Sequence, residues 1–167
     1  TAAAADAVPI RMRACGGEPL YVRPGSSDLL NAISYYRHGS ELPPPGIENP
    51  RTIVEVGSNC GVALTALALR FPEATLIGAE ADAANVAAAR RNLERFGARA
   101  TIVQAAIWDR EAEIVIDASN PAGEHAYAVR EAVAGDSPDL PRFQGTTVDA
   151  LLAANLPPGR EVDYLHV

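Results

Sequence analysis

The amino-acid sequence predicts an α/β fold built on a mostly parallel sheet. Between residues 52 and 106, short apolar segments rich in β-branched residues alternate with alanine-rich segments of helical periodicity. Apolar strands without a polar face are typical of sheets covered by helices on both sides. Because short loops join the segments, right-handed crossovers and a Rossmann-like sheet are expected.

Three strands and two helices make up this alternating part. The first strand is expected at Thr52 to Val56, followed by a helix from about Gly61 to Arg70. The second strand covers 74–80, and Asp82 is expected to cap the helix after it. The third strand covers residues 100–106. Each of the first two strands is therefore followed by a helical crossover, as parallel pairing requires.

The pattern changes after residue 107. Residues 112–119 alternate apolar and polar side chains and could pair with 124–131, which predicts an inserted antiparallel hairpin. A short helix at 145–155, capped by Thr146 or Thr147, precedes a last apolar strand at 162–167. Since that strand runs up to Val167, we expect the C-terminal part of the fold to be missing and a longer polypeptide to continue there.

The chain is expected to divide near residue 50. Residues 1–50 would form a small-residue tail (residues 1–9), a short strand, a helix at 28–37 and a proline-rich loop. Residues 51–167 would form the Rossmann-like domain. The apolar face of the first helix is expected to comprise Leu29, Leu30, Ile33 and Tyr36.

Composition excludes several classes of function. The chain has 167 residues, 48% of them apolar, and a formal net charge of -7, which indicates an acidic globular protein. The 14 Lys and Arg residues are scattered and do not form the basic patch that nucleic acids or anionic membranes require. Two cysteines without the Cys/His spacing of a metal site predict no metal and a reducing, cytoplasmic setting.

The turn after the first strand carries the main functional signal. Residues 55–61 read Glu-Val-Gly-Ser-Asn-Cys-Gly, at the carboxyl end of a parallel strand, where ligands of such sheets bind. A P-loop is excluded because no lysine ends this turn. A dinucleotide fingerprint is disfavoured because Asn59 and Val62 occupy two of its three glycine positions, and because Glu55 would repel a diphosphate.

S-adenosylmethionine fits these residues better. The carboxylate of Glu55 could stabilise its ammonium end, and N–H groups of the turn and of the helix start near Gly61 could bind its carboxylate. Gly57 and Gly61 would let the backbone approach the ligand closely. The turn is therefore predicted to bind the amino-acid part of this cofactor.

The next two strands could bind the adenosine part. Glu80, at the end of the second strand, is placed to accept the two ribose hydroxyls, and Ala105 and Ala106 are small enough to line the adenine. An acid at this position also serves dinucleotides, so an NAD(P)-dependent oxidoreductase stays an alternative. A non-catalytic Rossmann-like binding module is the other alternative.

With these residues in place, the sequence resembles the FkbM family of S-adenosylmethionine-dependent methyltransferases. The resemblance implies a class I methyltransferase fold and methylation of a hydroxyl group on a sugar or small metabolite. It places the predicted turn around the methionine part, Glu80 on the ribose and Ala105 or Ala106 near the adenine. The acidic Asp-x-Glu-Gly segment of the family would follow Val167. The stretches that carry it are "LYVRPGSSD", "IVEVGSNCGVALTALAL", "LIGAEADAANVAAARRNLERFG", "VQAAIWDREAEIVIDAS" and "GTTVDALLAANLPPGREVDYLHV". The turn residues implied to bind cofactor are Glu55, Gly57, Ser58, Asn59 and Gly61.

No catalytic residue is assigned from the sequence. A hydroxyl acceptor needs a base, and His125, in the predicted hairpin turn, is the best-placed histidine. His166 is expected to pack in the core. Arg23 and Asp28 could either contact a ligand or stabilise the turn before the first helix.

Overall fold

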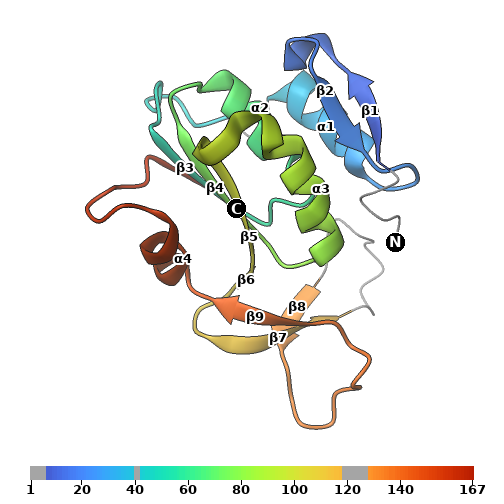
Figure 1. Cartoon of the computed structure of the whole chain (residues 1–167). Helices are drawn as coiled ribbons and strands as arrows, with labels where there is room; N and C mark the ends of the chain where they lie inside the picture. Colours follow the sequence, from blue (N-terminus) through green and yellow to red (C-terminus); the bar gives the residue numbers. More distant parts are fainter. Residues whose placement is uncertain (1–6, 40–41, 118–127) are drawn as a thin grey trace. The chain divides into compact units, whose positions relative to one another are not determined.

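The computed structural model describes residues 7–39, 42–117 and 128–167. These described residues belong to two compact units: those up to residue 104, together with 159–167, form the first unit, and those from 105 to 158 form the second. The elements of both units are labelled in Figure 1. The division predicted near residue 50 stays a prediction, because the two units reflect contacts within the chain and not independent folding.

A four-stranded parallel sheet with the order β10-β3-β4-β5 forms the centre of the first unit. All three neighbouring pairs are parallel, which confirms the predicted α/β fold with a mostly parallel, Rossmann-like sheet. The first two predicted strands match closely, and the third ends two residues earlier than predicted. The strands are β3 (Thr52–Val56), β4 (Thr75–Glu80), β5 (Ala100–Gln104) and β10 (Tyr164–His166).

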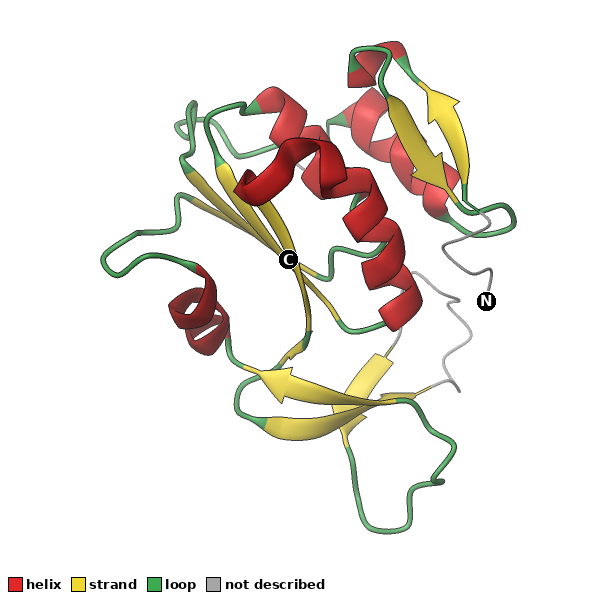
Figure 2. Ribbon diagram, in the orientation of Figure 1, coloured by secondary structure: helices red, strands yellow, loops and turns green. Residues whose placement is uncertain are grey.

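Two helices, α2 (Val62–Arg70) and α3 (Ala83–Leu93), cover one face of this sheet, as Figure 2 shows. Their alanines allow close approach, and the Asp82 side chain caps α3 by accepting a hydrogen bond from the Asn85 N–H, as predicted. A 3₁₀ helix, η3 (Glu94–Arg99), follows α3. The buried side chains between helices and sheet include Ile53, Leu64, Leu67, Leu76, Val86 and Ile102.

The first unit also contains an N-terminal antiparallel hairpin that the sequence predicted only in part. Strand β1 (Val8–Arg11) pairs with β2 (Pro19–Val22), and the short η2 (Arg13–Cys15) lies between them. Placing residues 8 and 9 in the N-terminal tail was wrong. Four residues without alternation carry little strand signal, and the partner strand supplies the pairing.

Helix α1 (Asp28–His38) forms as predicted but turns a different face to the protein. Leu29, Leu30 and Ile33 are 46%, 69% and 40% exposed, so the predicted apolar face is wrong for these three residues. The helix instead buries Asp28 and Ala32, and Tyr36, as predicted, packs with Tyr35 against a second buried cluster that includes Ala32. The buried Asp28 side chain sets this orientation, because its ion-pair partner lies inside the unit. Periodicity alone does not reveal such a contact.

The second unit is a four-stranded mixed sheet with the order β6-β9-β7-β8. Strands β7 and β8 pair antiparallel, which confirms the predicted inserted hairpin; its turn lies outside the described residues. Strand β9 was not predicted. The elements are β6 (Ala106–Ile107), β7 (Ala112–Asp117), β8 (Ala128–Glu131), β9 (Arg142–Thr146) and α4 (Val148–Asn155).

Helix α4 begins at the predicted cap. The Thr147 hydroxyl accepts a hydrogen bond from the Ala150 N–H at 3.1 Å. Across the described ranges of the chain, none of the helices combines the length and the apolar character needed to cross a bilayer.

Candidate functional site

The register of β3 and β4 places the two predicted acids on the same face of the sheet. Glu55 is paired with Gly78, and Glu80 lies two residues further along β4. Because alternate residues of a strand share a face, both carboxylates project toward the same side. Glu55 is 2% exposed and Glu80 is 8% exposed. The fold therefore brings together two buried acids at the carboxyl ends of neighbouring strands.

The absence of a side chain at position 78 makes room for the turn beside Glu55. A Cβ atom on Gly78 would lie 2.4 Å from the Ser58 Oγ and 2.7 Å from the Ile102 Cδ1. The buried Ser58 hydroxyl occupies this space and donates a hydrogen bond to the Glu55 carbonyl oxygen at 3.3 Å. Ser58 was predicted to lie near the methionine part of the cofactor. In the structure its hydroxyl contacts the backbone of Glu55, the residue predicted to bind the ammonium group.

The turn folds over the end of β4 through its own backbone. The N–H groups of Gly57 and Ser58 both donate to the Ala79 carbonyl oxygen, at 2.9 and 3.0 Å. Asn59 follows with a φ of 46°, a left-handed conformation that asparagine tolerates better than most residues. This conformation directs the Asn59 N–H toward the carboxylate of Glu80.

Glu80 is oriented by two backbone donors. Its Oε2 accepts from the Asn59 N–H at 2.9 Å, and its Oε1 accepts from the Asp82 N–H at 2.8 Å. The Asn85 amide lies 3.5 Å from Oε1. Burial raises the pKa of Glu80, and these three hydrogen bonds oppose that shift. A carboxylate has about four lone-pair sites, so Glu80 keeps acceptor capacity for further donors.

The N–H groups of the turn itself already have acceptors. In addition to the three donors above, the Cys60 N–H donates to the Asn59 Oδ1 at 2.7 Å, and the Gly61 N–H donates to the Ser58 carbonyl oxygen at 2.8 Å. These groups therefore have acceptors within the chain, and their binding of a ligand carboxylate stays a prediction. The turn uses them to fix its own conformation.

The two glycines of the turn have different roles. Gly57 has a φ of 76°, and a Cβ there would meet nothing within 4 Å. Gly61 has a φ of 74°, and its Cβ would lie 2.9 Å from the Cα and Cβ of Ala89 in α3. The close backbone approach expected at Gly61 is therefore made to a helix of the protein. Gly57 remains the glycine with open space beside it.

Glu55 has one oxygen with a protein partner and one without. Its Oε1 lies 3.3 Å from the Nδ1 of His166, while its Oε2 is buried with no hydrogen-bond partner in the described structure. His166 is the register partner of Glu55 across β10 and β3. The expectation that His166 only packs in the core is wrong, because its side chain is 20% exposed and faces Glu55. Only the strand order reveals this neighbour.

Arg23 and Asp28 form a buried ion pair behind the site. The Arg23 Nε and Nη2 donate to the two Asp28 oxygens at 2.9 and 2.8 Å, and Nη2 also donates to the Asn85 Oδ1 at 2.8 Å. Burial raises the pKa of Asp28, but the hydrogen bonds and charge of Arg23 outweigh it and hold that pKa below its usual value. Their role is thus to stabilise the turn before α1 and to support Asn85 next to Glu80.

The Cys60 thiol adjoins this ion pair. Cys60 is 1% exposed and fills a small space in the turn. Burial, together with the nearby Asp28 carboxylate, raises the pKa of the Cys60 thiol. The protonated thiol is therefore a packing group and a donor to Asp28.

Three predicted residues are not brought to this site by the described structure. Ala105 and Ala106 are buried in the second unit, so their role toward an adenine stays a prediction. His125 lies outside the described residues. Within the second unit, the neighbouring Trp108 donates from its Nε1 to the Glu131 carboxylate at 2.8 Å.

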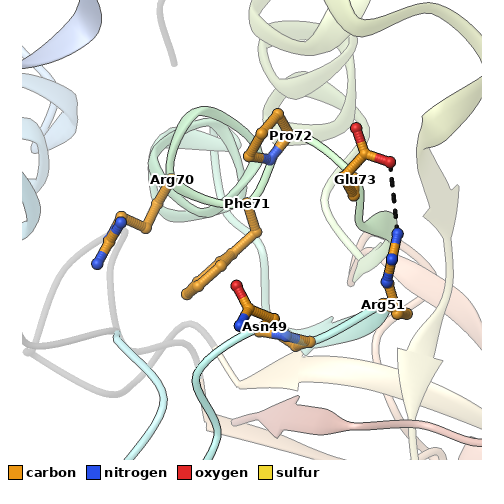
Figure 3. A pocket seen from close by; sticks show the side chains of 7 residues that line it. Asn49, Arg51, Arg70, Phe71, Pro72 and Glu73 are labelled. Atoms are coloured by element: carbon orange, nitrogen blue, oxygen red, sulfur yellow. Dashed lines mark hydrogen bonds and ion pairs between the residues drawn. The ribbon is translucent and has the colours of Figure 1, made fainter.

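A separate cavity of about 310 Å³ lies at the other end of the first sheet. Its residues precede β3 or lie between α2 and β4, so they are at the amino ends of the strands. Figure 3 shows Arg51 and Glu73 on its rim, paired at 3.4 Å and both well exposed. Ligands of such sheets bind at the carboxyl ends of the strands, and this cavity is therefore not the cofactor site. It is lined by Asn49, Pro50, Arg51, Arg70, Phe71, Pro72 and Glu73.

Part of the chain is similar in sequence to a curated protein and in fold to a solved structure. No family model matches the chain. A release factor glutamine methyltransferase of Geobacter sulfurreducens is 32% identical over 73 residues, which are 41% of this chain and 25% of the relative. The chain thus matches about a quarter of that relative's length. A solved structure of a putative O-methyltransferase from Klebsiella pneumoniae has 25% identity and a TM-score of 0.32, with 48% of this chain and 44% of that chain covered.

The sequence similarity is to one segment of a protein that is named as a methyltransferase. It does not distinguish the FkbM family from other class I methyltransferases.

Proposed function

We propose that this chain binds S-adenosylmethionine and belongs to a methyltransferase. The observation that carries the proposal is the Oε2 of Glu55, a buried carboxylate oxygen with no partner among the described residues, on the same sheet face as Glu80. A ligand that suits both acids has a cationic group for the first and vicinal hydroxyls for the second. S-adenosylmethionine has an ammonium group and a ribose.

The orphaned oxygen also separates the alternatives. A buried carboxylate oxygen without a partner costs free energy, which a cationic ligand group offsets and a diphosphate would increase. This favours S-adenosylmethionine over the nicotinamide dinucleotide of an oxidoreductase. In a non-catalytic module, both oxygens of Glu55 would be expected to have partners within the protein; Oε1 has one, but Oε2 does not.

Different residues of the chain would bind different parts of the cofactor. Glu55 would bind the ammonium group and Glu80 the ribose hydroxyls, while Ala105 and Ala106 would line the adenine. When bound, the cofactor supplies an activated methyl group. The chain's contribution is to orient it, and orientation can lower a barrier by roughly 7 to 11 kcal/mol in favourable cases. The base for a hydroxyl acceptor is not assigned among the described residues.

The proposed acceptor is a hydroxyl group of a sugar or small metabolite, which follows from the resemblance to the FkbM family. The Geobacter relative is named as a release factor glutamine methyltransferase, so a glutamine side chain is the alternative methyl acceptor. A cytoplasmic setting is also proposed, because Cys15 and Cys60 are both free and buried.

Calorimetry with S-adenosylhomocysteine tests the proposed cofactor. We expect saturable binding, weakened by Glu80→Ala by roughly 10- to 100-fold, since hydrogen bonds to a charged group contribute roughly 1.5–3 kcal/mol. Neither heat nor a thermal shift with S-adenosylhomocysteine, together with a thermal shift with NADH, would contradict the proposal and favour the oxidoreductase.

A further inference from the structure

We propose that His166 is a positioning residue for the cofactor's ammonium group, acting through Glu55. It donates a hydrogen bond from Nδ1 to Oε1 of Glu55 and thereby keeps Oε2 directed at the ligand. This inference rests on the proposed function. It assigns to β10 a part in ligand binding that the sequence did not indicate.

The two cross-strand neighbours of Glu55 are of very different kinds. On the β4 side the partner is Gly78, which has no side chain, and on the β10 side it is His166. Directly opposed residues in a sheet have their Cβ atoms close together and on the same face. Of these two neighbours, only His166 provides a polar side chain that can restrain the carboxylate.

The distance and the burial fit a restraining contact. Nδ1 of His166 lies 3.3 Å from Oε1, and the Glu55 side chain is only 2% exposed. Neutral imidazole donates from one ring nitrogen, so the contact does not require a charged histidine. A glutamate side chain has several rotatable bonds, and a donor on one oxygen removes part of that freedom before the ligand arrives.

The second oxygen then becomes the acceptor for the ligand. Oε2 is buried and has no hydrogen-bond partner, whereas both oxygens of Glu80 accept from backbone N–H groups. Backbone donors therefore orient one acid of the site, and a side chain from another strand orients the other. A change at His166 should affect only the part of the ligand that Glu55 binds.

Two ligands that differ in this part make the test specific. S-adenosylhomocysteine and methylthioadenosine share the nucleoside and the thioether, but only the first has the amino-acid arm. The dissociation constants of both are measured by calorimetry for the wild type and for His166→Ala. We expect roughly tenfold weaker binding of S-adenosylhomocysteine and less than twofold change for methylthioadenosine.

Matched variants separate positioning from simple loss of structure. His166→Asn keeps a side-chain N–H donor near the position of Nδ1 and should restore most of the affinity. Leu165→Ala changes an exposed residue of the same strand that points to the opposite face, and it should bind both ligands like the wild type. Should the alanine variant not fold, His166→Leu replaces it, because leucine fills space without donating.

The outcomes distinguish this inference from the function on which it rests. Wild-type protein that binds neither ligand overturns the proposed function and the inference with it. Wild-type binding with an unchanged His166→Ala variant overturns the inference alone. So does a variant that loses both ligands equally, because that pattern indicates a structural role.

Discussion

Oε1 of Glu55 lies 3.3 Å from Nδ1 of His166, while Oε2 of the same carboxylate is buried without a hydrogen-bond partner. The two residues are 111 positions apart in the chain and meet because β10 and β3 pair in parallel. Glu80, on the same sheet face, has both oxygens held by backbone donors. The proposed site thus consists of two buried acids that the protein orients in different ways.

The two acids should have separable effects on ligand binding. Glu80→Gln removes the charge and one acceptor oxygen next to the proposed ribose, so it should weaken S-adenosylhomocysteine and methylthioadenosine alike. Glu55→Gln should weaken only S-adenosylhomocysteine, because only this ligand has the ammonium group. Calorimetric titration of both variants with both ligands checks the pattern. Equal losses for Glu55→Gln with the two ligands would contradict the assignment of Glu55 to the amino-acid arm.

Gly78→Ala should destabilise the protein through a clash with the turn. The added Cβ would lie 2.4 Å from the Ser58 Oγ and 2.7 Å from the Ile102 Cδ1, and overpacking of this kind costs about 1–3 kcal/mol. The free energy of unfolding is measured with urea for the single variants and for Gly78→Ala with Ser58→Ala. The double variant should recover part of the loss because it lacks Oγ. Gly78→Ala with wild-type stability would show that the turn yields freely.

Arg23→Met should cost about 3–5 kcal/mol of unfolding free energy, because it leaves Asp28 buried without its counter-ion. The side chains of Arg23 and Asp28 are 5% and 0% exposed. Arg51→Met is the matched control: Arg51 and Glu73 are 61% and 78% exposed, and such surface pairs contribute about 0–1 kcal/mol. Urea unfolding compares the two, and equal losses would contradict a stabilising role for the buried pair. Arg23→Met with Asp28→Leu should be more stable than Arg23→Met alone.

The pH dependence of stability should contain a contribution from Glu80. Its pKa in the folded state lies above the ordinary value of 4.5, chiefly because of burial. Between the two pKa values the folded state binds more protons than the unfolded state, so this contribution to stability falls as the pH rises through the folded pKa. Glu80→Gln has no titrating group and should lack this fall. Unfolding free energies of wild type and variant from pH 4 to 8 check it.

Asp28 should contribute with the opposite sign. Its folded-state pKa lies below the ordinary value of 3.8, so the unfolded state binds more protons between the two values. The contribution of Asp28 to stability is therefore fully present above its pKa in the unfolded state. It is lost as the pH falls through its pKa in the folded state. Acid unfolding of the wild type should be steeper below pH 4 than that of the Arg23→Met, Asp28→Leu variant. Parallel curves would mean that this pair does not contribute to acid unfolding.

Local sequence signals were sufficient for the part of the site that lies on continuous segments. Strands β3 and β4, the cap of α3 by Asp82 and the acids at the strand ends followed from β-branched runs, capping residues and strand length. The same signals failed for β1 and β9 and for the orientation of α1. In those elements the pairing partner, or one buried ion pair, decides the structure. Apolar periodicity does not encode these contacts, whether the partner is near in the chain, as for β1 and for Arg23 with Asp28, or more distant, as for β9.

By itself, the sequence determined that Glu55 and Glu80 end neighbouring strand segments, because hydrophobic periodicity and chain direction are local properties. Only the tertiary structure decided that His166 lies beside Glu55, that Ala89 occupies the space next to Gly61, and that the first N–H groups of the turn find acceptors on β4. These contacts depend on strand order and on helix packing. Both result from burial of side chains that are distant in sequence, which no local pattern specifies.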